Sequence, residues 1–130
     1  MGFRKIKILV VEDDSAISQI IDYRLSQDGY AVILAKNGEE ALIEVAKGKP
    51  DLILLDIILP KINGFDVLKR IKNQPETKSI DVIVFSNLSQ KEDVARAKEY
   101  GALDFLVKAD FSADGLANFI NKHFSKNKQA

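Results

Sequence analysis

Three acidic residues in a row, Glu12, Asp13 and Asp14, follow directly on an apolar run in the stretch LVVEDDSAI. Neighbouring carboxylates repel one another and raise each other's pKa unless a cation offsets their charge. Carboxylates, carbonyls and water are the ligands of hard divalent cations, and Mg²⁺ commonly keeps several waters. We therefore interpret Asp13 as a direct ligand of Mg²⁺ and Glu12 as a ligand acting directly or through water. Asp14 is better suited to cap the helix that we expect to follow.

Three more polar residues, Asp56, Ser86 and Lys108, each end an apolar run further along the chain. Asp56 would add a second direct carboxylate to the cation site. A lysine supplies a point charge and a serine supplies a hydroxyl donor, and a phosphoryl group needs both kinds of contact. Because a carboxylate can itself attack phosphorus and form an aspartyl phosphate, Asp56 is our candidate nucleophile.

A regular alternation of two kinds of segment positions these residues. The apolar runs are short and mostly rich in Val and Ile, which is typical of strands buried on both faces of a parallel sheet. We expect strands at 6–11, 31–35, 51–55, 81–85 and 104–107. A helical pattern follows each run, and this alternation predicts an α/β fold with a parallel sheet and right-handed crossovers. The polar residues would then meet at the carboxyl ends of the strands, where such sheets bind ligands.

Capping residues predict where the helices begin. Candidate caps are Asn37, Asn63 and Ser112, and the stretch SQKE (89–92) has the pattern of a capping box. The helix after SQKE has an apolar face of one valine and two alanines, so we expect it to be held only weakly.

Composition narrows the class of protein. The 130 residues favour one domain, with a core over about 5–124 and a frayed polar tail at 125–130. Lys+Arg and Asp+Glu balance at 19 each, which gives no electrostatic footprint for nucleic acid or an anionic membrane. The absence of cysteine excludes disulfides and thiolate chemistry. No apolar run approaches the roughly 18 residues of a membrane span, and we expect a cytoplasmic location.

The sequence resembles the receiver domain of bacterial two-component response regulators over about residues 5–124. The resemblance rests on ILVVEDD (8–14), PDLILLDIILPKINGFDVL (50–68), VIVFS (82–86) and GALDFLVK (101–108). It implies a flavodoxin-like, five-stranded parallel sheet in the order 2-1-3-4-5, with helices on both faces.

The resemblance also implies a role for each residue at the strand ends. By position, Asp56 is similar to the phosphoacceptor, Glu12 and Asp13 are similar to the acidic Mg²⁺ pair, and the backbone carbonyl of Ile58 is similar to a further metal ligand. Ser86 and Lys108 are similar to the residues that bind the phosphoryl oxygens. Phe105 is similar to the aromatic residue whose rotation accompanies activation.

Two positions depart from the family pattern. Asn87 stands where the family usually has a small residue, and we expect it to narrow access to Asp56. Ala109 stands where the family usually has a cis proline. Because a cis bond before a residue other than proline costs about 3 kcal/mol, the loop is either rearranged or strained. Ile58 and Leu88 occupy two variable positions beside the path of the hydrolytic water, and their apolar side chains predict slow loss of a phosphoryl group.

The expected function is therefore that of a phosphorylation-dependent switch. A sensor histidine kinase or a histidine phosphotransfer protein would donate the phosphoryl group to Asp56 with Mg²⁺ as cofactor. The protein would catalyse only its own phosphorylation and dephosphorylation, and would not be an enzyme in the usual sense. The surface formed by the helix after SQKE (89–92), the strand at 104–107 and the helix capped by Ser112 would then change its affinity for a separate output protein or a phosphorelay partner.

Three alternatives fit the sequence less well. A pseudo-receiver that works by protein contact alone typically lacks the acceptor or the acids, and this chain keeps them all. A Mg²⁺-dependent phosphohydrolase similar to the haloacid dehalogenases needs a second Asp two residues after the first, where this chain has Ile58. A flavin-binding electron carrier needs a phosphate-binding loop after the strand at 6–11, and an acidic triplet there would repel phosphate. The polar end SKNKQA (125–130) also fits the start of a linker in a longer regulator.

Overall fold

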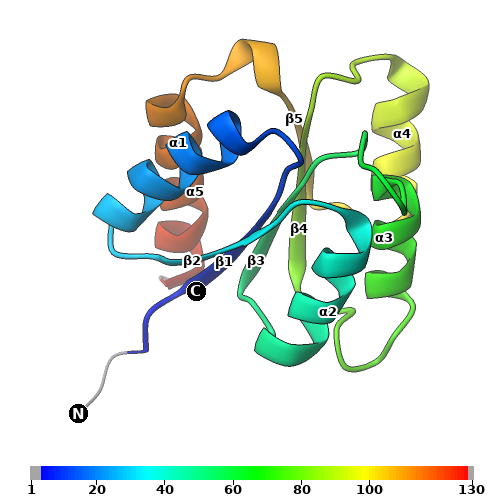
Figure 1. Cartoon of the computed structure of the whole chain (residues 1–130), viewed down its shortest axis with the longest axis horizontal. Coiled ribbons are helices and arrows are strands. Elements are labelled where there is room, and N and C mark those ends of the chain that lie inside the picture. The colour runs from blue at the N-terminus through cyan, green and yellow to red at the C-terminus, as the bar shows by residue number, and fades with distance from the viewer. Residues whose placement is uncertain (1–3, 129–130) are drawn as a thin grey trace.

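The computed structural model describes residues 4–128, in which strands and helices alternate along the chain (Figure 1). The strands are β1 (Lys7–Val11), β2 (Ala31–Ala35), β3 (Leu52–Leu55), β4 (Asp81–Ser86) and β5 (Asp104–Val107). The helices are α1 (Ser15–Gln27), α2 (Gly38–Gly48), α3 (Gly64–Lys72), α4 (Lys91–Glu99) and α5 (Ala113–Lys128), with a short 3₁₀ helix, η1 (Lys108–Asp110), before α5. The predicted strands are confirmed, and their ends shift by at most one residue.

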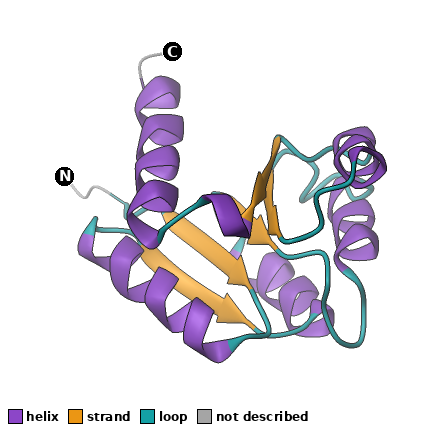
Figure 2. Ribbon diagram, turned by 90° about the horizontal axis from the view of Figure 1, so that it is seen from above, coloured by secondary structure: helices purple, strands orange, loops and turns teal. Residues whose placement is uncertain are grey.

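All strand pairs are parallel, and the sheet has the order β2-β1-β3-β4-β5. Helices α1 and α5 cover one face of the sheet, and α2, α3 and α4 cover the other (Figures 1 and 2). The predicted α/β fold, with its flavodoxin-like strand order and helices on both faces, is confirmed.

The two faces of the sheet carry two separate apolar clusters. Along β1, Ile8 and Val10 pack toward α1 and α5, whereas Leu9 and Val11 pack toward α2, α3 and α4. All four side chains are at most 2% exposed. A strand that is buried on both faces reads as a continuous apolar run, which explains why the sequence located β1 and β3 so clearly.

Most of the predicted helix caps are confirmed. The side chain of Asp14 accepts hydrogen bonds from the backbone N–H groups of the first turn of α1. Asn37 and Asn63 cap α2 and α3 at 2.8 Å and 3.1 Å, and Ser112 accepts a bond from the first turn of α5 at 3.0 Å. These contacts fix where each helix begins at the carboxyl edge of the sheet.

The capping box predicted at 89–92 is wrong. The N-cap of α4 is Gln90, one residue later than Ser89, and it makes no side-chain capping bond. The Gln90 carbonyl itself accepts the backbone N–H groups of Asp93 and Val94, so the first turn closes without a serine cap. Only Ala97 of this helix is buried, in agreement with the weak attachment expected from the sequence.

The end of the chain differs in part from the expected frayed tail. Helix α5 continues to Lys128, so the polar segment is helical from 125 to 128, and residues 129 and 130 lie outside the described part. None of the helices within residues 4–128 is both long enough and apolar enough to cross a membrane.

Gly64 begins α3 and lies against the backbone that carries Asp56. A Cβ added there would lie 2.3 Å from the Asp56 carbonyl oxygen and 2.5 Å from the Ile57 Cα. Because both atoms belong to the backbone, the clash cannot be relieved by turning a side chain. Gly64→Ala should therefore lower the free energy of unfolding by about 1–3 kcal/mol in urea denaturation. Gly48→Ala is the matched control, because its Cβ meets only Ile33 at 3.7 Å. If the two variants were equally stable, close packing at Gly64 would not matter.

Candidate functional site

The carboxyl ends of β1, β3 and β5 bring three charged residues into direct contact. The Lys108 ammonium lies 2.7 Å from Asp56 Oδ2 and also contacts Glu12 Oε1. The three side chains are 13%, 6% and 3% exposed for Lys108, Asp56 and Glu12, so the contacts are largely shielded from water. Glu12 and Asp56, which are far apart in the sequence, thus share one cation at the edge of the sheet.

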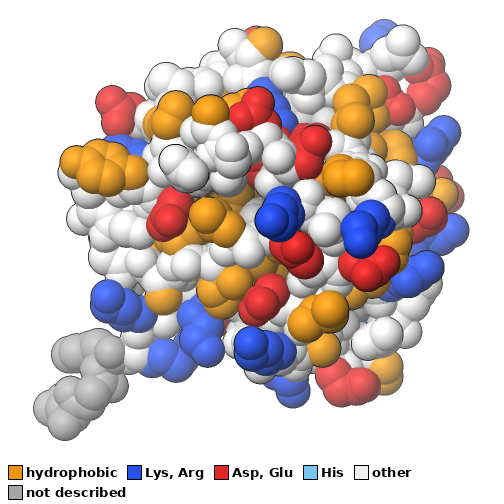
Figure 3. Space-filling model, in the orientation of Figure 1, with side chains coloured by type: hydrophobic (Ala, Val, Ile, Leu, Met, Phe, Trp, Pro, Cys, Tyr) orange, Lys and Arg blue, Asp and Glu red, His pale blue; other side chains and the backbone are white. Residues whose placement is uncertain are grey.

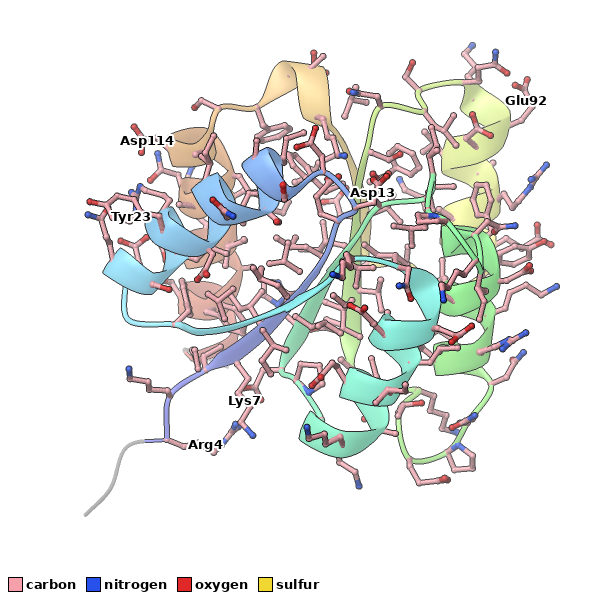
Figure 4. The ribbon with its side chains drawn as sticks, viewed as in Figure 1. Arg4, Lys7, Asp13, Tyr23, Glu92 and Asp114 are labelled. Carbon is pink, nitrogen blue, oxygen red and sulfur yellow. The ribbon has the colours of Figure 1, made fainter. Side chains whose placement is uncertain are left out.

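Glu12, Asp13 and Asp56 form a cluster that could hold a metal ion. One carboxylate oxygen of each lies within 4.8 Å of the others, with Glu12 and Asp56 buried and Asp13 exposed. Asp13 lies at the end of β1 (Figure 4), and acidic side chains reach the surface at this edge of the sheet (Figure 3). Asp14 does not join the cluster, because its side chain caps α1 and its backbone N–H donates to Glu12 Oε2 at 3.0 Å.

Burial and charge act against each other at this cluster. Burial raises the pKa of Glu12, and the nearby charge of Asp56 adds to this effect, whereas the hydrogen bonds from Lys108 and from the Asp14 N–H oppose it. Burial alone would lower the pKa of Lys108, but its hydrogen bonds to Asp56 and Glu12, together with their charges, raise it overall. Lys108 therefore stays charged and is the internal counterion of two buried carboxylates.

A hollow of about 290 Å³ opens above these charges. Its lining includes Glu12, Asp13, Asp56, Ile58, Asn87 and Lys108. The Ile58 side chain is 59% exposed, and its backbone N–H donates to Asp56 Oδ1 at 3.2 Å. Asp56 thus has one oxygen held by a backbone N–H and the other by an ammonium.

Ser86 and Leu88, also predicted to belong to the site, do not line this hollow. Ser86 is fully buried at the end of β4, and its hydroxyl accepts a bond from the Leu88 N–H at 3.4 Å. The Leu88 side chain packs against the apolar cluster beneath α2, α3 and α4. Phe105 is half-buried against the same cluster.

The loop after Lys108 is rearranged rather than strained by a cis bond. Every peptide bond in the described residues is trans, and Lys108–Asp110 forms the short helix η1. The N–H of Ala109 donates to the side-chain oxygen of Asn87 at 3.2 Å. The sequence showed both departures but not that they contact each other. The only signal was that an alanine at 109 has an N–H that a proline would lack.

Comparison with known proteins agrees with this geometry. Residues 8–121 match the response regulator receiver domain family, and the chain belongs to that family. Its members are the receiver domains of two-component systems. A probable transcriptional regulator ycf27 from Porphyra purpurea is 39% identical over 108 residues, which cover 83% of this chain and 43% of that protein. The chain spans less than half the length of the curated relatives that it resembles.

Solved structures show the same fold. Chemotaxis protein CheY4 of Vibrio cholerae is 28% identical, with a TM-score of 0.84 over 92% of this chain and 98% of that one. The Mn²⁺-bound form of response regulator Rcp1 is 31% identical, with a TM-score of 0.77 over 88% of each chain. The second structure shows that a relative of this chain binds a divalent cation.

Removing the shared ammonium should destabilise the protein at pH 7 when no divalent cation is present. Lys108→Met keeps the apolar stem and leaves Glu12 and Asp56 buried without a counterion, so the free energy of unfolding should fall by about 3 kcal/mol. Urea denaturation measures this difference. Lys91→Met is the matched control, since Lys91 is exposed at the start of α4 and its loss should change stability by less than about 0.5 kcal/mol.

The pH dependence of this difference follows from the raised pKa of Lys108. A raised lysine pKa gives stability that is fully present below the unfolded-state value of 10.5 and is lost as the pH rises through the folded-state pKa. The advantage of the wild type over Lys108→Met should therefore be full at pH 7 and shrink in alkaline solution above 10.5. A difference that stayed constant there would show that the charge of Lys108 is not responsible.

Proposed function

We propose that this receiver domain accepts a phosphoryl group from a phosphohistidine donor onto Asp56, with Mg²⁺, and passes the signal to another protein. The observation that carries the proposal is the Asp56 carboxylate, which lies 2.7 Å from the Lys108 ammonium, beside two further acids, in an accessible hollow. A lone aspartate at a strand end would need none of these neighbours. The donor would be a sensor histidine kinase or a histidine phosphotransfer protein.

The donor set fits Mg²⁺. Glu12, Asp13 and Asp56 would hold the ion through carboxylate oxygens, and the backbone carbonyl of Ile58 would add a further oxygen. When bound, the ion neutralises charge on the Asp56 carboxylate and on the phosphoryl oxygens. Glu12 supports this assignment, because it is only 4% exposed, and burial without a sufficient cation disfavours its charged form.

The residues of this chain have distinct parts in the transfer. An Asp56 carboxylate oxygen attacks phosphorus and forms the new P–O bond, while the P–N bond of the donor breaks and its electron pair returns to the histidine nitrogen. The Ile58 N–H, at 3.2 Å from Asp56 Oδ1, fixes the carboxylate plane. Lys108 turns its ammonium from the carboxylate to the phosphoryl oxygens, which carry the charge after transfer.

The switch would follow from the new charge of about −1.5 to −2 on Asp56. Ser86 is fully buried and does not line the hollow. Its hydroxyl must therefore move toward the hollow, together with the segment after β4, to bind a phosphoryl oxygen. Phe105 packs against the same apolar cluster as Leu88 and would follow this movement. Because α4 buries only Ala97 and has no side-chain cap, its attachment offers little resistance. The surface of α4, β5 and α5 would thereby change its affinity for a separate, cytoplasmic output protein.

The decisive experiment is phosphorylation by acetyl phosphate and Mg²⁺, followed by intact mass. The wild type should gain one phosphoryl group, and Asp56→Asn, which keeps the side-chain shape, should gain none. Asp110→Asn is the matched control, because Asp110 is exposed on η1 and does not line the hollow. Labelling of Asp56→Asn at the wild-type rate would place the acceptor elsewhere. A wild type that is never labelled would instead favour a pseudo-receiver.

The phosphorylated state should be long-lived, because Ile58 cannot orient a water. Its exposed side chain lines the hollow, whereas Leu88 packs against the core, so Ile58 carries most of the effect. Ile58→Asn should speed loss of the phosphoryl group about tenfold or more, measured by mass over time after removal of the donor. Ile43→Asn is the matched control, since Ile43 is 60% exposed on α2 and remote from the hollow. The idea is wrong if both variants lose the group at the wild-type rate.

A further inference from the structure

The side chain of Asn87 is oriented by a hydrogen bond to the segment that follows the neighbouring strand β5. Its carboxamide lies 3.2 Å from the backbone nitrogen of Ala109, in η1. Because that nitrogen can only donate, the carboxamide atom facing it must be the oxygen. The two polar atoms of a carboxamide diverge from one carbon, so the position of the oxygen also sets the position of the amide nitrogen. Ala109 can hold Asn87 in this way only because it is not a proline.

Asn87 also lines the hollow that contains the Asp56 carboxylate. Its amide nitrogen makes no hydrogen bond to any of the described residues. Apart from the lysine, the charged residues around the hollow are all acids, which offer acceptors and no donors: Glu12, Asp13, Asp14 and Asp56. A phosphoryl group arriving here needs donors for its oxygens, and in this conformation Ser86 does not reach the hollow. Asn87 supplies a donor where Ser86 does not.

We propose that the side chain of Asn87 donates a hydrogen bond to a phosphoryl oxygen on Asp56, with the Ala109 N–H as its positioning group. This inference rests on the proposed function and assigns to Asn87 a phosphoryl-binding role. The two departures from the family pattern then act as a pair. Because residue 109 is alanine and not proline, it has a backbone N–H. That N–H orients the side-chain amide of Asn87, which a small residue at 87 would lack.

The rival interpretation is that Asn87 only narrows access to Asp56, as the sequence suggested. The two interpretations predict opposite signs for the same substitution. If Asn87 is an obstacle, Asn87→Ala opens the hollow, so phosphoryl groups bind more tightly and labelling becomes faster. If Asn87 is a donor, Asn87→Ala removes a bond to a charged oxygen and weakens binding.

Fluoroberyllate, a non-covalent mimic of a phosphoryl group, tests this by calorimetric titration in the presence of Mg²⁺. Asn87→Asp keeps an oxygen for the Ala109 N–H but replaces the amide donor by a second oxygen with negative charge. It should weaken fluoroberyllate binding more than tenfold, and Asn87→Ala should weaken it about tenfold. The affinity for Mg²⁺ alone should not fall in either variant, because neither removes a carboxylate of the cluster. A loss confined to the anion is not expected from a merely structural role.

Asn63→Asp is the matched control for the added charge. Asn63 caps α3 at the same edge of the sheet but does not line the hollow, and an aspartate preserves the cap. It should leave fluoroberyllate binding within about twofold of the wild type, since distant exposed charges are largely screened by salt. An Asn87→Ala variant that binds fluoroberyllate as tightly as the wild type, or more tightly, overturns the inference.

Failure of the inference and failure of the proposed function are distinguishable in the same experiment. If the wild type binds fluoroberyllate and is labelled by acetyl phosphate while the Asn87 variants match it, only the role of Asn87 is wrong. If the wild type neither binds fluoroberyllate nor is labelled, the proposed function fails, and the role of Asn87 fails with it.

Discussion

The ion pair between Lys108 and two buried carboxylates is the constraint on which the site depends. Glu12 and Asp56 end adjacent parallel strands, so the sheet register forces their side chains together. Two carboxylates that are at most 6% exposed would repel strongly without a cation. Lys108 reaches them from β5, on the far side of β4, and so connects the ends of three strands. Any ligand of this site must alter the way in which Lys108 neutralises the two carboxylates.

The charge of this ion pair explains why the proposed mechanism needs both a divalent cation and a phosphoryl group. A divalent cation would take over the neutralisation of Glu12 and Asp56 and free the Lys108 ammonium from them. A phosphoryl group would in turn offer that ammonium new oxygens. In the proposed mechanism the ammonium of Lys108 therefore exchanges carboxylate oxygens for phosphoryl oxygens.

The segments after the adjacent strands β4 and β5 form a second, neutral connection beside the same hollow. The Asn87 to Ala109 hydrogen bond joins them directly, in a chain whose two residues at these positions differ from the usual family pattern. Helix α4, which follows the first segment, buries only Ala97. The segment after β4 is thus held by this hydrogen bond and by the packing of Leu88 and Ala97, whereas the sheet beneath it is buried between two apolar clusters.

The sequence by itself determined the fold, because burial on both faces of β1 and β3 leaves continuous apolar runs and because polar residues then mark the strand ends. It also indicated that Glu12, Asp13, Asp56 and Lys108 lie together, since parallel strands bring their carboxyl ends to one edge, but it wrongly placed Ser86 and Leu88 beside them. Only the tertiary structure decided how they pair: that Lys108 contacts Glu12 as well as Asp56, that Ser86 is withdrawn, and that Asn87 is held by Ala109. Such contacts join residues far apart in the chain, and their geometry depends on loop conformations that local patterns do not encode. The wrong capping box at 89–92 has a local cause instead, because the helix begins one residue later, at Gln90, whose backbone carbonyl closes the first turn.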